Sequence, residues 1–142
     1  MIVGVRRLLA AASIAGYLMI GVPAAAHHAF AAEYDANKPL KLRGVVTLVE
    51  WINPHAWVYI DVKQEDGNTV NWAIETGAPN ALIRRGFKRG SIPIGAEILV
   101  NGYQAKNGSR KINGKDVTLP DGKSLFVGSS GTGAPVDPKP KH

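Results

Sequence analysis

Short runs of alternating apolar and polar residues, separated by turn-forming residues, occupy the chain from Leu40 to Val127. Alternation with a period of two is typical of strands that bury one face. The pattern predicts strands over residues 40–52, 56–64, 69–76 and 97–105, and a last hairpin that pairs 116–119 with 124–127. The first run is apolar on both faces, which indicates a strand that bends to serve two sheets, and Gly44 would relax the chain at such a bend.

One short helix is predicted between the third and fourth strands. Pro79 suits the first helical position and Gly86 follows the last one, an asymmetry typical of helix ends. Three strands, a helix and further strands are the order of an OB-fold barrel. We therefore predict an all-β fold, a small OB-fold-like antiparallel barrel with one short helix between strands 3 and 4. A small antiparallel sandwich is the alternative.

An OB-fold barrel also predicts where ligands bind. Such barrels bind them on the face of strands two and three and at the loops that join strands one to two and four to five. Here these loops are Asn53–His55 and residues 107–115. The alternation further predicts a set of core residues: Val58, Ile60, Val70, Ile74, Leu82 and Val100.

The first 26 residues are typical of a secretory signal peptide. Arg6 and Arg7 precede an apolar run from Leu8 to Val22, and small residues up to Ala26 form a cleavage site. The run is short of the ~20 residues that span a membrane. We expect cleavage between Ala26 and His27, a periplasmic or secreted location, and no transmembrane segment after processing.

The mature chain would have three parts. We expect an N-terminal arm over residues 27–39, the OB-like domain over 40–128, and a disordered tail over 129–142 that is rich in Gly, Ser, Pro and Lys. The whole chain has a net charge of +6, and loss of two arginines with the leader would leave +4. Export argues against nucleic acid as a partner. The absence of cysteine excludes thiolate metal sites and disulfides.

Several motifs of the mature chain resemble a family of exported bacterial proteins catalogued as domain of unknown function 6152. The motifs are His27-His28-Ala-Phe30, Glu33-Tyr34-Asp35, Trp51-Ile-Asn53-Pro54-His55-Ala-Trp57, Gly77-Ala-Pro79-Asn80 and Arg84-Arg85-Gly86-Phe87. The resemblance implies export and a similar size. It implies no activity.

The candidate chemistry lies at His27, His28 and His55. After cleavage, the α-amine and Nδ1 of His27 could chelate one metal ion, and a further imidazole would complete a set of nitrogen donors that suits copper. Alternatively, the amine, an amide nitrogen and His28 could bind Cu(II) without the folded domain. Glu33, Asp35 and Glu50 are candidate oxygen ligands or hydrogen-bond acceptors beside the metal. Each could equally be a solvated surface residue.

For one ion to use both His sites, the arm must bring His27 within roughly 4 Å of His55, since each imidazole–metal bond is about 2 Å long. The arm is long enough, because a dozen residues extend about 40 Å. Phe30 and Tyr34 could hold it on the sheet. Otherwise His55 packs between Trp51 and Trp57 as an ordinary loop residue.

Two further surfaces are candidates for binding. Trp51, Trp57, Tyr59 and Trp72 could form an aromatic ligand face, or part of the core. Arg84, Arg85, Lys88 and Arg89 form a basic patch that could bind anionic lipid or an acidic partner.

The sequence therefore supports two main hypotheses. The first is an exported copper-binding protein with no catalytic role. The second is a metal-free accessory module that binds a partner or small molecule. A copper oxidase or monooxygenase is a third, which the same ligands would permit, whereas Ser91, Ser109 and Ser124 lie in no hydrolase motif.

Overall fold

The computed structural model describes residues 30–128, so the predicted leader, His27, His28 and the predicted tail lie outside the described residues. Six strands and a short helix follow a helical turn at residues 30–33. In chain order the elements are β1 (Tyr34–Glu50), β2 (Trp57–Lys63), β3 (Thr69–Glu75), α2 (Pro79–Arg84), β4 (Glu97–Ala105), β5 (Lys111–Thr118) and β6 (Ser124–Phe126). No helix among these residues is long and apolar enough to cross a membrane.

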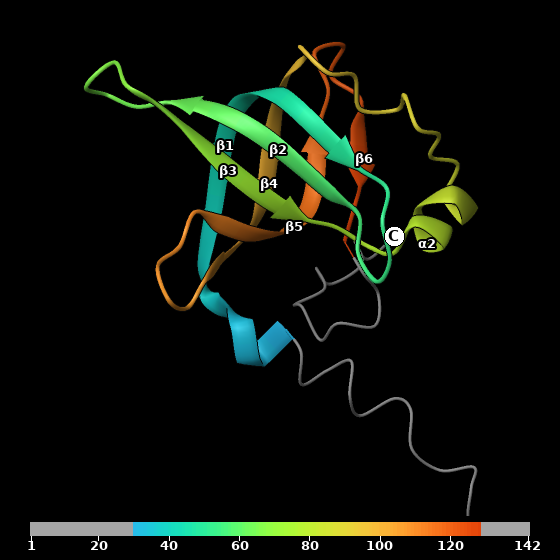
Figure 1. The fold of residues 1–142 in the computed structure, drawn as a ribbon, viewed down its shortest axis with the longest axis horizontal. Helices are drawn as coiled ribbons and strands as arrows, with labels where there is room; N and C mark the ends of the chain where they lie inside the picture. Colours follow the sequence, from blue (N-terminus) through green and yellow to red (C-terminus); the bar gives the residue numbers. More distant parts are fainter. Residues whose placement is uncertain (1–29, 129–142) are drawn as a thin grey trace, which may run out of the picture.

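The strands form a ring (Figure 1). The sheet order is β3-β2-β1-β4-β5-β6, and an additional parallel pairing between β3 and β5 joins its two sides. That pairing comprises three residue pairs, from Ala73↔Lys111 to Glu75↔Asn113, so the barrel is only partly closed. The mostly antiparallel ring with one short helix confirms the predicted OB-fold-like class.

β1 is the long strand that serves two neighbours. It pairs with β4 from Tyr34 to Val45 and with β2 from Val45 to Glu50. Apolar residues occur on both of its faces because the register shifts between Val46 and Leu48, which places Val46 in the core and leaves Leu48 44% exposed. The buried face of β1 therefore changes at this register shift, which follows Gly44, where the bend was predicted. At Gly44 a Cβ would lie 2.6 Å from the Asp61 carbonyl oxygen, so glycine here allows β2 to approach closely.

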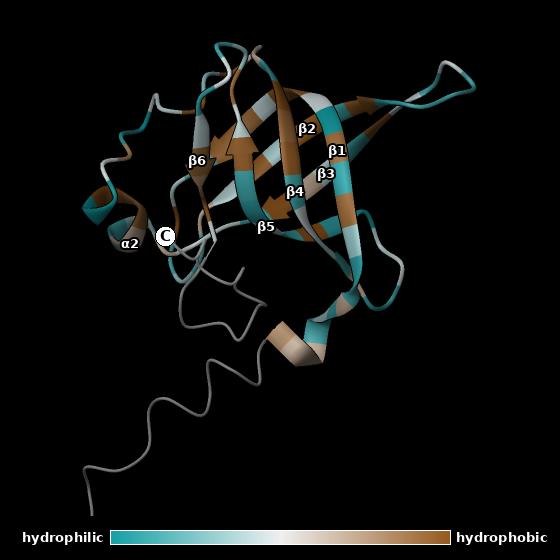
Figure 2. Ribbon diagram, turned by 180° about the vertical axis from the view of Figure 1, so that it is seen from behind, coloured by the Kyte–Doolittle hydropathy of each residue, from teal (hydrophilic) through white to brown (hydrophobic). Residues whose placement is uncertain are grey.

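The core lies inside the ring. The alternation of buried and exposed residues along β2 follows the sequence pattern, and Figure 2 shows apolar and polar residues interleaved on the strands. Five of the six predicted core residues are at most 4% exposed: Val58, Ile60, Ile74, Leu82 and Val100. The sixth, Val70, is partly buried and packs against the same cluster.

Two strands begin well before their predicted starts. β1 begins at Tyr34, so the second half of the expected arm is a strand that pairs with β4. β5 begins at Lys111, inside the expected connector 107–115. Both segments are polar and lack alternation, and their pairing with strands distant in sequence makes them strands. The helix, by contrast, begins at Pro79 as predicted and buries Leu82.

Candidate functional site

A cavity of about 420 Å³ lies where the helical turn at 30–33 meets the barrel. Four parts of the chain line it: the N-terminal turn with the start of β1, the β1–β2 loop with the start of β2, the end of β3, and the start of β5. Its lining residues are Phe30, Ala32, Glu33, Tyr34, His55, Trp57, Glu75, Lys111 and Asn113. The β1–β2 loop and the segment after β4 thus meet at one cavity, as the OB-fold order predicts.

Backbone hydrogen bonds hold the loop that carries His55. The Asn53–Pro54 peptide bond is cis. Immediately after His55, the amide of Ala56 donates to the Gly77 carbonyl, and the amide and hydroxyl of Thr76 both donate to the Ala56 carbonyl. These bonds extend the β2–β3 pairing past the ends of both strands. His55 therefore sits on a well-fixed backbone rather than on a free loop.

The imidazole of His55 has one nitrogen engaged. Its Nδ1 lies 3.0 Å from the Thr76 carbonyl oxygen and 3.4 Å from Oε1 of Glu75. A carbonyl oxygen can only accept, so Nδ1 carries the hydrogen and Nε2 keeps its lone pair in the neutral ring. A histidine that donates from one ring nitrogen to a carbonyl or carboxylate is the arrangement that orients metal-binding imidazoles.

Glu75 is the buried acid of the site. It is 8% exposed, and the Tyr34 hydroxyl donates a hydrogen bond to its Oε2. Burial and this hydrogen bond to Glu75 raise the pKa of the Tyr34 phenol far above its ordinary value. The phenol is therefore a permanent donor, and the Glu75 carboxylate lies between Tyr34 and His55.

An aromatic cluster holds the N-terminal turn on the barrel. Phe30 stacks on Tyr34 with ring centroids 5.7 Å apart and meets Tyr103 edge-on at 5.5 Å. Phe30 and Tyr34 are 4% and 2% exposed. The expectation that these two residues hold the arm on the sheet is confirmed for residues 30–34.

The remaining polar residues complete the charge of the cavity. Lys111 Nζ lies 3.1 Å from Oε2 of Glu33 and 5.4 Å from the centre of the Tyr34 ring. Asn113 is 3% exposed and pairs with Glu75 across the β3–β5 pairing. With a neutral His55, two carboxylates and one ammonium group leave the lining with one net negative charge, which favours a bound cation.

The structure separates the other candidate residues. Of the three carboxylates proposed beside the metal, only Glu33 lines the cavity. Asp35 accepts from the backbone amide of Asn37, and Glu50 accepts from the hydroxyl of Tyr59. Neither lines the cavity.

The four aromatic residues do not share one face. Trp57 and Tyr59 lie on the outer face of β2, where Trp57 reaches the cavity. Trp72 pairs with the buried Ile60, and both Trp72 and Trp51 pack against the core. The outer face thus offers two aromatic residues rather than four.

Four polar lining residues were not among the candidate site residues drawn from the sequence: Tyr34, Glu75, Lys111 and Asn113. One signal could have found Glu75. The turn-forming residues Asp66-Gly67-Asn68 between β2 and β3 set the register of that hairpin, and counting back from them pairs Glu75 with Trp57, beside His55.

Within residues 30–128 no group of three or more His, Asp or Glu side chains is arranged to hold a metal ion. His55 and Glu75 are therefore at most part of a metal site, and further ligands must come from elsewhere. His27 and His28, which the sequence offers for this role, lie outside the described residues.

The comparison with known families decides the affiliation of the chain. Residues 16–114 match the model of a family of unknown function, DUF6152. The chain belongs to the DUF6152 family. The match confirms the resemblance of the sequence motifs, and it extends from the predicted leader to β5. No curated protein and no solved structure matches the DUF6152 chain.

Proposed function

We propose that this DUF6152 protein is an exported binding protein that holds one copper ion through the mature N-terminal histidines, His27 and His28, and His55. One observation carries the proposal: Phe30 and His55 line the same cavity. His28 precedes Phe30 by two residues, a separation of at most about 7 Å along the chain. This short separation would allow the N-terminal ligands to reach the loop ligand.

The state of His55 supports the proposal. Its Nδ1 donates to Thr76, which leaves Nε2 as a lone-pair donor on a fixed ring. Nitrogen donors from imidazoles and an amine are the set that Cu(II) binds most strongly among divalent first-row metals. Glu75, whose Oε1 lies 3.4 Å from Nδ1, supplies a nearby negative charge that offsets part of the charge of the ion.

The size of the cavity favours a second function, that of a metal-free accessory module. A volume of about 420 Å³ lies within the range of small-molecule pockets, and both the aromatic Trp57 and the polar Asn113 line it. In this alternative, a small molecule or a segment of a partner protein occupies the cavity, and His55 hydrogen-bonds to it.

Copper titration of the mature protein, beginning at His27, tests the proposal. We expect one Cu(II) per chain, and His55→Ala should weaken binding more than about a hundredfold, since loss of a supporting partner alone costs about 10–100-fold. A chain with one extra N-terminal residue should also bind more weakly. Absence of copper binding in every form of the protein would leave the accessory module as the function.

A further inference from the structure

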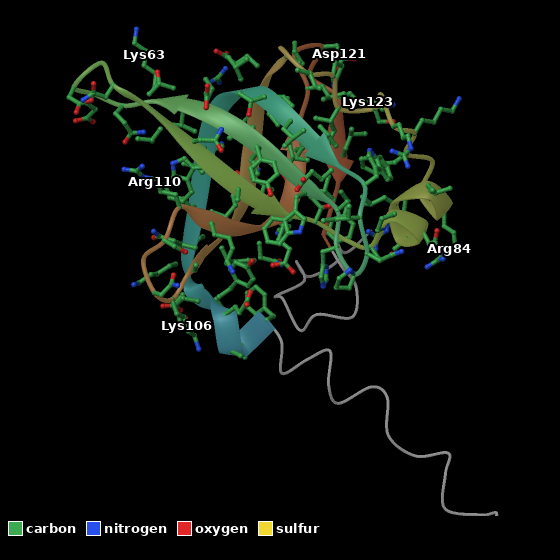
Figure 3. All side chains as sticks on the ribbon, viewed as in Figure 1. Lys63, Arg84, Lys106, Arg110, Asp121 and Lys123 are labelled. Carbon is green, nitrogen blue, oxygen red and sulfur yellow. The ribbon has the colours of Figure 1, made fainter. Side chains whose placement is uncertain are left out.

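A second surface surrounds α2 and differs from the cavity in charge and composition. Four of its cationic residues are exposed: Arg84, Arg85, Lys88 and Arg89. Figure 3 shows Arg84 projecting from α2 away from the barrel, with Lys123 of the β5–β6 turn on the same side of the molecule. We call α2, the loop 86–94 and this turn the basic surface.

The cations of the basic surface differ in how they are held. The guanidinium of Arg85 donates to the Gly128 carbonyl and lies 4.8 Å from the centre of the Phe126 ring. Within residues 30–128, Arg84, Lys88 and Arg89 form no ion pair with a carboxylate. No carboxylate of residues 30–128 compensates their charges, which are therefore available to an external anion.

The basic surface also exposes two large aliphatic side chains. Ile83, next to Arg84 on α2, is 56% exposed, and Ile94, at the end of the loop, is 67% exposed. The buried residues of this segment, Leu82 and Phe87, hold it on the barrel. Isolated aliphatic side chains among flexible cations suit the boundary between phosphate headgroups and acyl chains.

A groove crosses the same surface. It has a volume of about 210 Å³ and lies between the α2 loop and the β5–β6 hairpin. Arg85, Ser91 and Lys123 line it together with apolar residues of both elements. The groove therefore combines two cations and a hydroxyl, which are the groups that bind a phosphate.

We infer that the basic surface docks the protein on an anionic phospholipid membrane, with the cations on the phosphate groups and Ile83 and Ile94 at the acyl boundary. The inference is independent of copper, because none of its residues lines the cavity. An acidic partner protein would meet the same charges but would not require the exposed aliphatic residues. These residues favour lipid as the occupant.

Co-sedimentation of the full mature chain with vesicles tests the inference. With about one third phosphatidylglycerol in phosphatidylcholine, each cation near the surface contributes about 1 kcal/mol. The triple variant R84S/K88S/R89S should therefore lose about a hundredfold in partition coefficient. Ile83→Ser should lose about fivefold. Vesicles of phosphatidylcholine alone should not bind the wild type.

A matched control removes the same charge elsewhere. Lys38, Lys41 and Lys63 are exposed on β1 and β2, and K38S/K41S/K63S should retain most of the binding. Equal losses in the two triple variants would overturn the inference, since binding would then reflect net charge alone. Thermal unfolding of each variant checks that the fold is intact.

Two further experiments distinguish lipid from other anions as the ligand of the basic surface. Inorganic phosphate could displace the protein from the vesicles more than chloride does at equal ionic strength. That result would indicate a free-anion site in the groove and overturn membrane docking. Binding of polyglutamate that is as tight as vesicle binding and unaffected by Ile83→Ser would identify an acidic partner surface instead.

Discussion

The cavity under the N-terminal turn and the basic surface around α2 have opposite physical characters. In the cavity, Glu75 and Tyr34 are buried and bonded to each other, and the His55 ring has a fixed partner. On the basic surface, Arg84 and Lys88 are solvated and carry no intramolecular ion pair among residues 30–128. The first region is built by a few mutually dependent contacts, and the second by independent charges. Single substitutions should therefore change stability in the cavity, whereas a single substitution of Arg84 or Lys88 on the basic surface should not.

The largest expected difference between the regions is in how much a glycine-to-alanine substitution destabilises the protein. A Cβ at Gly102 would lie 2.2 Å from the carbonyl oxygen of Asn113, a cavity residue, so β4 and β5 must separate to admit it. Gly102→Ala should destabilise the protein by about 3 kcal/mol. At Gly90, in the basic surface, a Cβ meets nothing within 4 Å, and Gly90→Ala should be neutral within about 0.5 kcal/mol. Urea unfolding of both variants measures the difference, and equal effects would remove the contrast.

The next effect is on the buried hydrogen bond. Tyr34→Phe leaves the aromatic cluster intact but removes a donor from the buried Glu75, which should cost about 2 kcal/mol. Tyr59→Phe is the matched control, because its hydroxyl bonds Glu50 at 2.9 Å in a partly exposed position, and it should cost less than about 1 kcal/mol. A Tyr34→Phe variant as stable as the Tyr59→Phe variant would show that the buried carboxylate does not need this donor.

A smaller effect should appear in alkali. Because the pKa of Tyr34 is raised in the folded protein, only the unfolded chain loses the proton near the ordinary tyrosine pKa of about 10. The resulting stability is fully present below pH ~10 and falls as the pH rises, by about 1.4 kcal/mol at pH ~11. The Tyr34→Phe variant lacks this component, so its stability should fall less between these pH values. Parallel loss in both proteins, measured by urea unfolding, would contradict the assignment.

The smallest effect is expected for the exposed cations. Arg84→Ser should change the free energy of unfolding by no more than about 0.5 kcal/mol. Arg85→Ser should cost about 1 kcal/mol more, because Arg85 donates to Gly128 and contacts Phe126. Thermal unfolding of the Arg84→Ser and Arg85→Ser variants measures this difference in stability. A large loss at Arg84 would mean that the basic surface is part of the folded framework.

The sequence predicted the hairpins and the helix because their signals are local. Strand β4 has the predicted bounds. β2 is one residue shorter than predicted at both ends, and β3 is one residue shorter at its C-terminal end. The first residues of β1 and β5 were not predictable in this way. Asn37-Lys38-Pro39 shows no alternation, and it becomes strand because Pro39 lies opposite Tyr103 of β4. Such pairing depends on the assembled ring.

The candidate site was predicted less completely than the fold. His55 and Glu33 were identified by residue type, and both line the cavity. Tyr34 had been assigned only a packing role, since its bond to Glu75 joins residues 41 positions apart. Lys111 and Asn113 lie in the loop 107–115, which the OB-fold order assigned to ligand binding without singling out any of its residues. These contacts follow from the β3–β5 pairing, which no local pattern encodes.

The most direct test of the copper proposal is the electron paramagnetic resonance spectrum of the mature protein with one equivalent of Cu(II). We predict a single tetragonal species with nitrogen hyperfine structure from His55 as well as from the N-terminus. His55→Ala should remove one nitrogen from that structure, whereas His142→Ala, which changes a histidine far along the chain, should leave the spectrum as it is. Identical spectra and equal copper affinities for the wild type and His55→Ala would contradict the account and place the ion on the N-terminal residues alone.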